Sequence, residues 1–454
     1  MPEIVYEFDE ILQQIRHTIA TDDKEQFREI FLNNHTYDQA QIYLNLEPEE
    51  RQSVYEFLTP AEMADLFEII EEDVEDVEDY LKEMDIKYAA KMLANMYADN
   101  AVDVLQQVKE EDVIAYLRLM PHKAAIEIRE LLNYEDHTAG AMMTTEYIAL
   151  REKQTVGQAM TYVKQMAAEA ETVYYVYVVD DANHLQGVIT LRDLILQPDH
   201  ALIKDIMKDR IVTVNVQDDK NEVAQMIRDY DFLAIPVIDE ENELLGIVTV
   251  DDAIDVMDEE ATSDYSGLAG VNVDTQNTNP FIAASKRLPW LITLLFLGMG
   301  TSSLLSRYEN VIEQASVLSI FVTLITGTAG NAGTQSLAVA VRKLSAHEDE
   351  ISFFKLLIHE ISTGLISGLV TGLTITIVVG LWQQNWILGA VIGLAMFCAI
   401  TVATLAGSFI PVLMDRIGVD PAVASGPFIS TLSDLTSVLI YFSIAKNFLD
   451  AFLK

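Results

Sequence analysis

The strongest constraint on the fold is a set of five long apolar runs in the C-terminal part of the chain. A helix needs about 20 apolar residues to cross the hydrocarbon core of a bilayer. The sequence therefore predicts a membrane domain over 281–454, in contact with membrane lipid. Its five transmembrane helices are expected over 288–305, 315–341, 353–382, 386–413 and 421–448.

The formal net charge of −42 is concentrated outside these runs. Residues 286–454 contain 9 Lys+Arg and 10 Asp+Glu, whereas residues 1–285 contain 20 and 61. A solvated acidic surface accounts for most of these carboxylates, but not for the whole imbalance. Such self-repulsion destabilises a compact state unless cations screen or bind it. It also makes nucleic acid a poor partner, so none is expected.

The first part of the acidic half, residues 1–133, has the pattern of short amphipathic helices in tandem. Segments 59–67 and 88–93 place Ala, Leu and Met at helical spacing, and Pro60 suits a first helical turn. We expect an acidic all-α superhelical domain. Taken alone, this segment indicates an interaction or scaffold module.

Residues 140–260 contain an internal repeat, and each copy is predicted to run strand, helix, strand, turn, strand, helix. The repeated pieces, all 59 residues apart, are Val178-Val179-Asp180 with Val237-Ile238-Asp239, Gly187-Val188-Ile189-Thr190 with Gly246-Ile247-Val248-Thr249, and Asp193 with Asp252. This pattern resembles a tandem pair of α/β CBS domains, over 134–200 and 201–258. CBS pairs often bind adenine nucleotides, so the resemblance implies ATP as a ligand. Asp193 would contact the ribose, although a plain helix cap is the favoured role for it.

Basic residues in the loops predict the topology, because cytoplasmic loops are enriched in Lys and Arg. Six of them share the side of the acidic half, and three lie on the other side. The N-terminus is therefore expected in the cytoplasm, and five spans place the C-terminus outside the cell inner (plasma) membrane. The first set is Lys286, Arg287, Arg342, Lys343, Lys355 and Arg416; the second is Arg307, Lys446 and Lys454.

Asp434 lies 14 residues into the last run, close to the expected bilayer midplane. A carboxylate there costs at least about 2.5–3.5 kcal/mol and normally faces a bundle interior or a water-filled path. Helical spacing puts it on a polar stripe with Pro427, Ser430, Ser437 and Tyr441. An ion path is the favoured interpretation, and a structural Asp bonded to Ser or Thr is the alternative.

The second apolar run contains the segment Gly327-Thr328-Ala329-Gly330-Asn331-Ala332-Gly333-Thr334-Gln335. Three glycines are expected to weaken the helix and free backbone carbonyls, while Asn331 and Gln335 add side-chain oxygens. Small-residue helix packing is the alternative for the glycines. With a single carboxylate counted in the path, the donors are all oxygen, as hard cations require. Mg²⁺ dehydrates reluctantly and would pass with its water shell; Ca²⁺ is its chemical competitor.

The order of these parts resembles the MgtE family of Mg²⁺ channels, and the resemblance covers nearly the whole chain. It rests on Arg287-Leu288-Pro289-Trp290, Gly330-Asn331-Ala332-Gly333-Thr334-Gln335-Ser336, Asp420-Pro421-Ala422, Thr431-Leu432-Ser433-Asp434 and His137-Thr138-Ala139-Gly140 with Met143-Thr144. It implies a homodimer with a pore at the subunit interface. Asp434 would select hydrated Mg²⁺, and Asp420 would lie at the cytoplasmic mouth. Thr323 departs from the family, where a proline is expected.

The resemblance also implies that residues 251–280 form an acidic connecting helix, the plug, followed by a linker. Mg²⁺ would bridge its carboxylates to those of the CBS and N-terminal domains and close the pore when cytosolic Mg²⁺ is high. The regulatory metal ligands implied are Asp252, Asp255, Glu260, Asp264, Asp219, Asp231, Asp99 and Asp103. A solvated acidic helix is the alternative. Asn221 and Ser263 stand where the family usually has acids.

Other functions fit the sequence less well. An intramembrane metalloprotease needs two His at i, i+4 with an adjacent Glu. His359-Glu360 begins that pattern, but position 363 is Thr, so no enzyme is expected. An anion transporter would need basic residues at the midplane. A less selective carrier of Mn²⁺, Co²⁺ or Ca²⁺ stays open as the second candidate.

Overall fold

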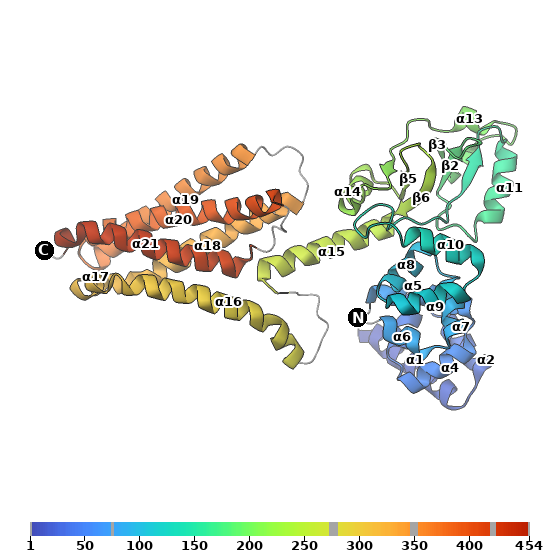
Figure 1. Ribbon diagram of the computed structural model, residues 1–454, viewed down its shortest axis with the longest axis horizontal. Helices are drawn as coiled ribbons and strands as arrows, with labels where there is room; N and C mark the ends of the chain where they lie inside the picture. Colours follow the sequence, from blue (N-terminus) through green and yellow to red (C-terminus); the bar gives the residue numbers. More distant parts are fainter. Residues whose placement is uncertain (1, 74–76, 272–279, 346–352, 418–423, 453–454) are drawn as a thin grey trace. The chain divides into compact units, whose positions relative to one another are not determined.

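The computed structural model describes residues 2–73, 77–271, 280–345, 353–417 and 424–452. It divides into two compact units, Met1–Val256 and Met257–Lys454 (Figure 1). Unit 1 contains short helices and two small sheets, and unit 2 contains the long apolar helices. The predicted combination of an all-α domain, an α/β repeat and membrane helices is confirmed.

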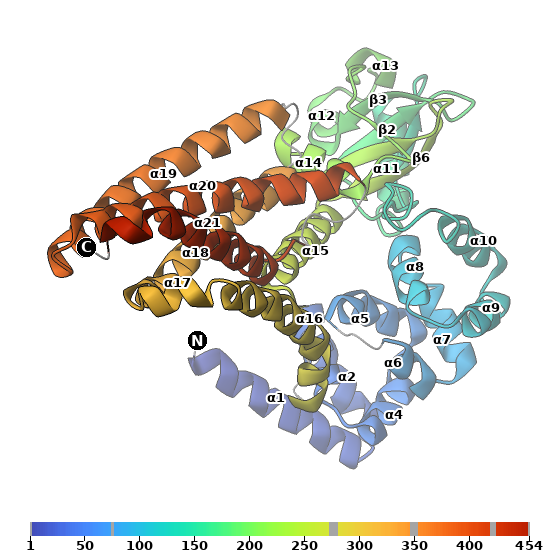
Figure 2. The ribbon, with the colours of Figure 1, turned by 60° about the vertical axis from the view of Figure 1, so that its left-hand side comes forward.

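Short helices form the N-terminal part of unit 1 (Figure 2). Asp23 and Asp85 begin two of them by accepting hydrogen bonds from first-turn N–H groups, and Pro60 opens another. Their apolar faces meet in a core that includes Phe27 and Phe67. The helices are α1 (Pro2–Ala20), α2 (Lys24–Leu32), α3 (Thr36–Leu44), α4 (Pro48–Phe57), α5 (Pro60–Asp73), α6 (Val77–Glu83), α7 (Ile86–Leu93), α8 (Ala98–Gln106), α9 (Glu110–Leu119) and α10 (His122–Leu131).

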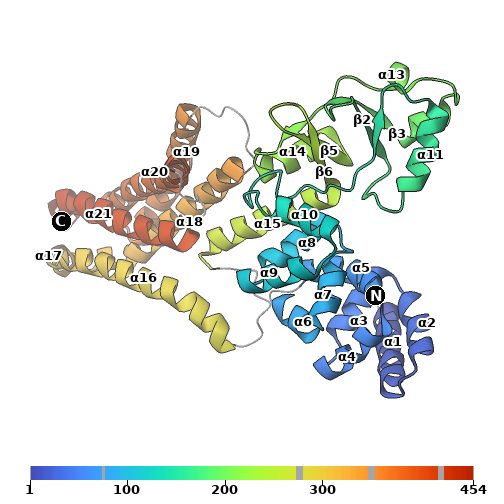
Figure 3. The same cartoon turned by 45° about the vertical axis from the view of Figure 1, so that its right-hand side comes forward.

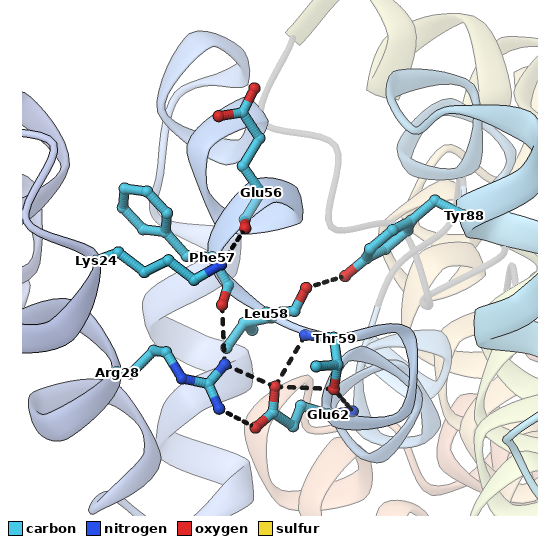
Figure 4. A network of polar contacts seen from close by, with 8 residues as sticks. All are labelled: Lys24, Arg28, Glu56, Phe57, Leu58, Thr59, Glu62 and Tyr88. Carbon is cyan, nitrogen blue, oxygen red and sulfur yellow. Dashed lines mark hydrogen bonds and ion pairs between the residues drawn. The ribbon is translucent and has the colours of Figure 1, made fainter.

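Two arginine–glutamate pairs fix the spacing of these helices. Arg28 in α2 donates to Glu62 in α5 over 2.8 Å, and Glu62 also accepts from the backbone N–H of Thr59 (Figure 4). These hydrogen bonds lower the pKa of Glu62 to about 2. Arg51 and Glu83 form the same kind of pair between α4 and α6. Both arginines therefore bind helices that are not neighbours in sequence.

The two sheets share one topology, which confirms the predicted repeat (Figure 3). In each, the first strand pairs parallel with the second, and the second pairs antiparallel with the third. The first repeat contains β1 (Ala149–Arg151), α11 (Val156–Met166), β2 (Tyr175–Val179), β3 (Leu185–Thr190) and α12 (Leu191–Leu196). The second contains α13 (Ile203–Ile206), β4 (Val214–Asn215), α14 (Lys220–Tyr230), β5 (Ala234–Ile238) and β6 (Leu244–Thr249).

In each repeat, the segment before the first strand pairs with the sheet of the other repeat. The N–H of Thr144, which precedes β1, donates to Ile247 in β6 over 2.8 Å. The N–H of Lys208, which precedes β4, donates to Val188 in β3 over 2.9 Å. The predicted boundary at residue 200 therefore separates the repeats in sequence, whereas each sheet is extended by the leading segment of the other repeat.

The long helices of unit 2 confirm the five predicted spans. Among the residues that the structure describes, five helices are long and apolar enough to cross a membrane. The connecting helix α15 ends at Ala269, and residues 272–279 of the predicted linker lie outside the described part. The elements are α15 (Val250–Ala269), α16 (Pro280–Ser306), α17 (Glu309–Gln314), α18 (Val317–Ser345), α19 (Phe353–Trp382), α20 (Trp386–Arg416) and α21 (Gly426–Phe452).

Glycines bring α19 and α20 into close contact. Gly364, Gly368 and Gly372 follow one another at four-residue spacing and therefore share one face of α19. A Cβ on Gly368 would lie 2.7 Å from the carbonyl oxygen of Phe397, and one on Gly372 would lie 2.6 Å from that of Gly393. This is the small-residue packing by which membrane helices associate. We call this contact the glycine seam.

Candidate ion path and acidic junction

The glycine-rich segment 327–335 is helical throughout, within α18. A Cβ on Gly330 would lie 2.8 Å from Ser430 Oγ, and one on Gly333 would lie 3.0 Å from Ser433 Oγ, both in α21. The expectation of a weakened helix with free carbonyls is therefore wrong. Close packing of α18 against α21 explains these two glycines, because any side chain would hold the helices apart.

Asn331 and Gln335 lie on the side of α18 that unit 2 leaves exposed. They are four residues apart, so they share a face, and Thr323 is exposed as well. An amide in contact with hydrocarbon would lose the hydrogen bonds it makes in water. This face of α18 therefore requires water or another protein surface beside it.

Asp434 is half-buried in α21, between two fully buried serines. Ser433 and Ser437 are 1% and 0% exposed, and neither hydroxyl has a hydrogen-bond partner among the described residues. Tyr441 donates its hydroxyl to the carbonyl of Leu318 in α18 over 3.0 Å, so it has a structural role in the predicted stripe. In the described part of unit 2, no hydrogen bond joins Asp434 to Asn331.

Glu360 is a second carboxylate inside a membrane helix, which the sequence interpretation considered only as part of a metalloprotease pattern. It is 4% exposed in α19 and accepts a hydrogen bond from Ser336 Oγ over 2.6 Å. The sequence interpretation counted one carboxylate in the ion path, Asp434, and did not assign Glu360 to that path. The position of Glu360 one turn before Gly364, on the four-residue pattern of the seam, is the sequence signal that indicates burial. Asp420, the other predicted pore residue, lies outside the described residues.

The C-terminal end of α15 is anchored within unit 2. Gly270 ends the helix with φ +68, and its Cα faces the indole of Trp290 in α16. Leu268 packs into the apolar cluster that contains Leu337 and Ile429. A side chain at Gly270 would meet both strain at this φ and the Trp290 ring. The connecting helix is therefore attached to the helices that carry the candidate ion path.

In unit 1, carboxylates from separate parts of the chain converge at a place that we call the acidic junction. Asp99 comes from α8, Glu171 from the segment after α11, and Asp252 from the first turn of α15. Burial, and then repulsion from neighbouring carboxylates, raises the pKa of Asp99 well above its usual value. The same two effects raise the pKa of Glu171 to about 8. Burial raises the pKa of Asp252 to about 6.

Glu68 and Glu146 complete the acidic junction, and the sequence interpretation did not include either of them or Glu171. Burial raises the pKa of Glu68 to about 7, although its side chain accepts from the N–H of Tyr97. Glu146 accepts from Thr144 Oγ1 over 2.7 Å. Within the described residues, none of the five carboxylates pairs with a basic side chain. The junction therefore lacks a counter-charge from the protein.

The remaining predicted regulatory acids are spread over the surface of the two units. Asp103, Asp231 and Asp255 are exposed, and Asp219 caps α14 by accepting from the N–H of Asn221. Glu260 and Asp264 are half-buried in α15. Of the eight predicted regulatory acids, the structure therefore brings Asp99 and Asp252 together. Across the described ranges, no three His, Cys, Asp or Glu side chains form a preformed metal site.

Asp193 occupies the position in the first repeat that Asp252 occupies in the second. Its carboxylate accepts from Thr190 Oγ1 over 2.7 Å, in a capping box at the start of α12. Asp252 makes the equivalent contact with Thr249 Oγ1 over 2.6 Å. Asp193 is therefore a helix cap, as favoured from the sequence, while its contact with a nucleotide stays a prediction.

A domain of five apolar helices with an internal carboxylate, joined by an acidic helix to a CBS pair, is typical of a membrane ion transporter. Known families match each part. The MgtE divalent cation transporter family matches residues 322–444, the MgtE intracellular N domain matches 34–137, and the CBS domain matches 139–198 and 203–259.

Relatives match nearly the whole chain. The magnesium transporter MgtE of Enterococcus faecalis is 59% identical over 447 residues, which are 98% of this chain and 99% of the relative. That of Thermus thermophilus is 38% identical over 360 residues, 78% and 80% of the two chains. The chain belongs to the MgtE family of magnesium transporters.

Solved structures resemble the N-terminal part of the chain. The soluble part of a magnesium transporter matches with a TM-score of 0.55 and 52% identity, over 56% of this chain and 99% of the other. The cytosolic domain of the Mg²⁺ channel MgtE, in complex with ATP, matches with a TM-score of 0.51 and 35% identity, over 54% and 99%.

Proposed function

We propose that this chain carries Mg²⁺ across a membrane along a path lined by α18 and α21. The observation that carries the proposal is Asp434, a half-buried carboxylate in a membrane helix with no ion pair among the described residues. A charge in this position is normally retained for ion passage. Its neighbours Ser433 and Ser437 add hydroxyl oxygens, which suit a hydrated hard cation. The naming of its relatives as magnesium transporters supports Mg²⁺ as the ion.

A homodimer would provide hydrogen-bond partners for the exposed polar face of α18. Asn331 and Gln335 are exposed within one chain, and lipid would leave their amides without hydrogen bonds. A second copy that contributes the same face would enclose water between two such helices. The path would then lie at the subunit interface, with Asp420 at its cytoplasmic mouth.

Regulation would come from the acidic junction and from α15. Like charges at Asp99, Glu171 and Asp252 disfavour the compact arrangement, and a bound divalent cation would offset that repulsion. Mg²⁺ that binds the compact state more tightly shifts the population toward it. Because α15 ends against Trp290, such a shift would reach the path and close it when cytosolic Mg²⁺ is high.

Two further features belong to this proposal. A relative's cytosolic domain was solved with ATP, so a nucleotide at the CBS pair is proposed here too. The membrane would be the plasma membrane, with the N-terminus in the cytoplasm and the C-terminus outside. Transport of Mn²⁺, Co²⁺ or Ca²⁺ by the same oxygen donors is the second candidate.

Flux into proteoliposomes tests the ion path. Asp434→Asn removes the charge while it preserves the shape of the side chain, so Mg²⁺ influx is expected to fall to the level of empty vesicles. Glu313→Gln, an exposed acid in α17, is the matched control and should transport normally. Asp434→Asn with normal influx and normal Mg²⁺ preference would exclude the assignment. Parallel influx assays with Mn²⁺, Co²⁺ and Ca²⁺ distinguish the two candidate functions.

Deletion of residues 1–260 tests the regulation. The truncated protein retains α16 to α21 and should conduct in Mg²⁺ concentrations that close the full chain. Single-channel recording on both proteins measures this directly. If the truncated protein closes at the same Mg²⁺ concentration as the full chain, feedback through the acidic half is rejected.

A further inference from the structure

Glu360 is buried at the end of the glycine seam that is nearest the N-terminus of α19. It lies one turn before Gly364, where an added Cβ would lie 3.2 Å from the Cβ of Thr404 in α20. Because α19 and α20 run antiparallel, one turn back from Gly364 in α19 corresponds to one turn forward from Thr404 in α20. Glu360 is therefore level with Ser408. Thr404 and Ser408 are 5% and 1% exposed. The Glu360 carboxylate therefore lies at a level where α20 supplies hydroxyl groups, on the most closely packed helix pair of unit 2.

Ser336 connects this rigid pair to α18. Its Cβ lies 3.1 Å from the position that a Cβ on Gly407 in α20 would take, and its hydroxyl donates to Glu360 over 2.6 Å. No basic side chain within the described residues forms an ion pair with Glu360. A hydrogen bond to a carboxylate is among the stronger side-chain contacts, and burial strengthens it. Ser336 and Glu360 therefore hold α18 against the seam at a defined point.

The hydrogen bond from Ser336 to Glu360 contributes to the rotation of α18 about its axis, together with buried side chains of α18 such as Leu337 and Val341. Ser336 follows Gln335 directly, so the two side chains diverge by about 100° around the helix. With Ser336 turned inward, Gln335 and Asn331 are turned to the exposed side. Gly330 and Gly333 contact α21 without side chains, so they allow close approach but offer little resistance to rotation.

We propose that Glu360 is a positioning residue for the ion path: through Ser336 it helps to set the rotation of α18 that presents Asn331 and Gln335. This inference rests on the proposed function, since it assigns those amides to the path. Loss of the hydrogen bond would let α18 turn and change how the hydrated ion is bound. The maximum rate and the amount of folded protein would change less, because the glycine contacts persist.

Concentration-dependent Mg²⁺ influx into proteoliposomes tests the proposal on the full chain. Glu360→Ala and Ser336→Ala should each raise the half-saturating Mg²⁺ concentration by about threefold or more, the range in which helix positioning alters a distant site. The double variant should resemble either single one, because both remove the same contact. Glu360→Gln and Ser336→Thr retain an acceptor and a hydroxyl, and should restore the wild-type value.

Thr363→Ala is the matched control, since Thr363 is an exposed hydroxyl in the same helix that bonds only to the carbonyl of His359. A purely structural role would lower the yield of folded protein and the maximum influx but leave half-saturation unchanged, and that result overturns the proposal. So would additive effects in the double variant. Wild-type protein without Mg²⁺ influx would instead refute the proposed function, so the two failures are distinct.

Discussion

At the scale of single residues, glycines determine how closely the helices of unit 2 pack, because glycine has a hydrogen atom where other residues have a side chain. Gly407 in α20 faces the carbonyl oxygen of Gly333, which a Cβ would strike. Gly327 in α18, by contrast, has open space where its Cβ would be. Gly407 and Gly327 therefore differ sharply in whether a side chain can be added at their positions.

We predict that Gly407→Val destabilises the membrane domain by about 3 kcal/mol or more, because α18 and α20 must separate to admit the side chain. Gly327→Val should change stability by less than about 1 kcal/mol. Thermal unfolding in detergent, followed by loss of the monodisperse peak in size-exclusion chromatography, measures both. Equal melting temperatures for the two variants would show that the close contact between Gly407 and Gly333 does not contribute to stability.

The two intramembrane carboxylates show what a sequence can predict about single residues. Asp434 was predicted because it interrupts an apolar run near its centre. Glu360 was considered only with His359, as the start of a metalloprotease pattern, because it stands near the end of a run, where a charge is less conspicuous. Its role depends on Ser336, 24 residues earlier, and a contact between helices has no signature within either helix.

At the scale of elements, the equivalent caps of the two repeats provide a matched comparison. Asp193 and Asp252 both accept from a threonine hydroxyl, but Asp252 also belongs to the acidic junction. Burial, together with the charge of Asp251, holds the pKa of Asp252 at about 6. Near neutral pH it is therefore mostly ionised, and that ionisation destabilises the folded state relative to the unfolded chain.

Asp252→Asn retains a cap acceptor and removes the repelled charge. Without divalent cations at pH 7.5, we expect it to stabilise unit 1 by about 1 kcal/mol, a rise in melting temperature of roughly 2–4 °C. Asp193→Asn should produce no such rise. Differential scanning calorimetry of residues 1–270, with EDTA, measures both variants. A gain common to both would indicate an effect of the cap and not of the junction.

The elements themselves were largely predictable, whereas their partners were not. Apolar periodicity and the 59-residue repeat predicted the five spans and both sheets. The exchange of Thr144 and Lys208 between repeats was missed because strand pairing is a non-local choice. The glycines of α18 were misinterpreted because glycines such as Gly330 and Gly333 are compatible both with an opened helix and with close helix packing. The position of α21, which the sequence does not provide, decides between the two.

At the scale of the whole molecule, the raised pKa values of the acidic junction make the stability of unit 1 depend on pH. Glu171, Glu68 and Asp252 have pKa values of about 8, 7 and 6 in the folded chain, all above those of free carboxylates. A carboxylate with a raised folded pKa binds its proton more tightly in the folded state. Its stabilising effect is therefore complete below the unfolded pKa and is lost as pH rises through the folded value.

Unit 1 should consequently lose stability between about pH 4.5 and pH 8, opposite to the effect of a salt-bridged acid such as Glu62. Calorimetry of residues 1–270 in EDTA should show a melting temperature lower at pH 8.5 than at pH 5.5 by roughly 3–10 °C. Millimolar Mg²⁺ should restore most of the difference at pH 8.5 and change little at pH 5.5, where Glu171, Glu68 and much of Asp252 are already protonated. Equal stabilisation by Mg²⁺ at both pH values would place the responsible sites outside the acidic junction, on carboxylates that are ionised throughout this range.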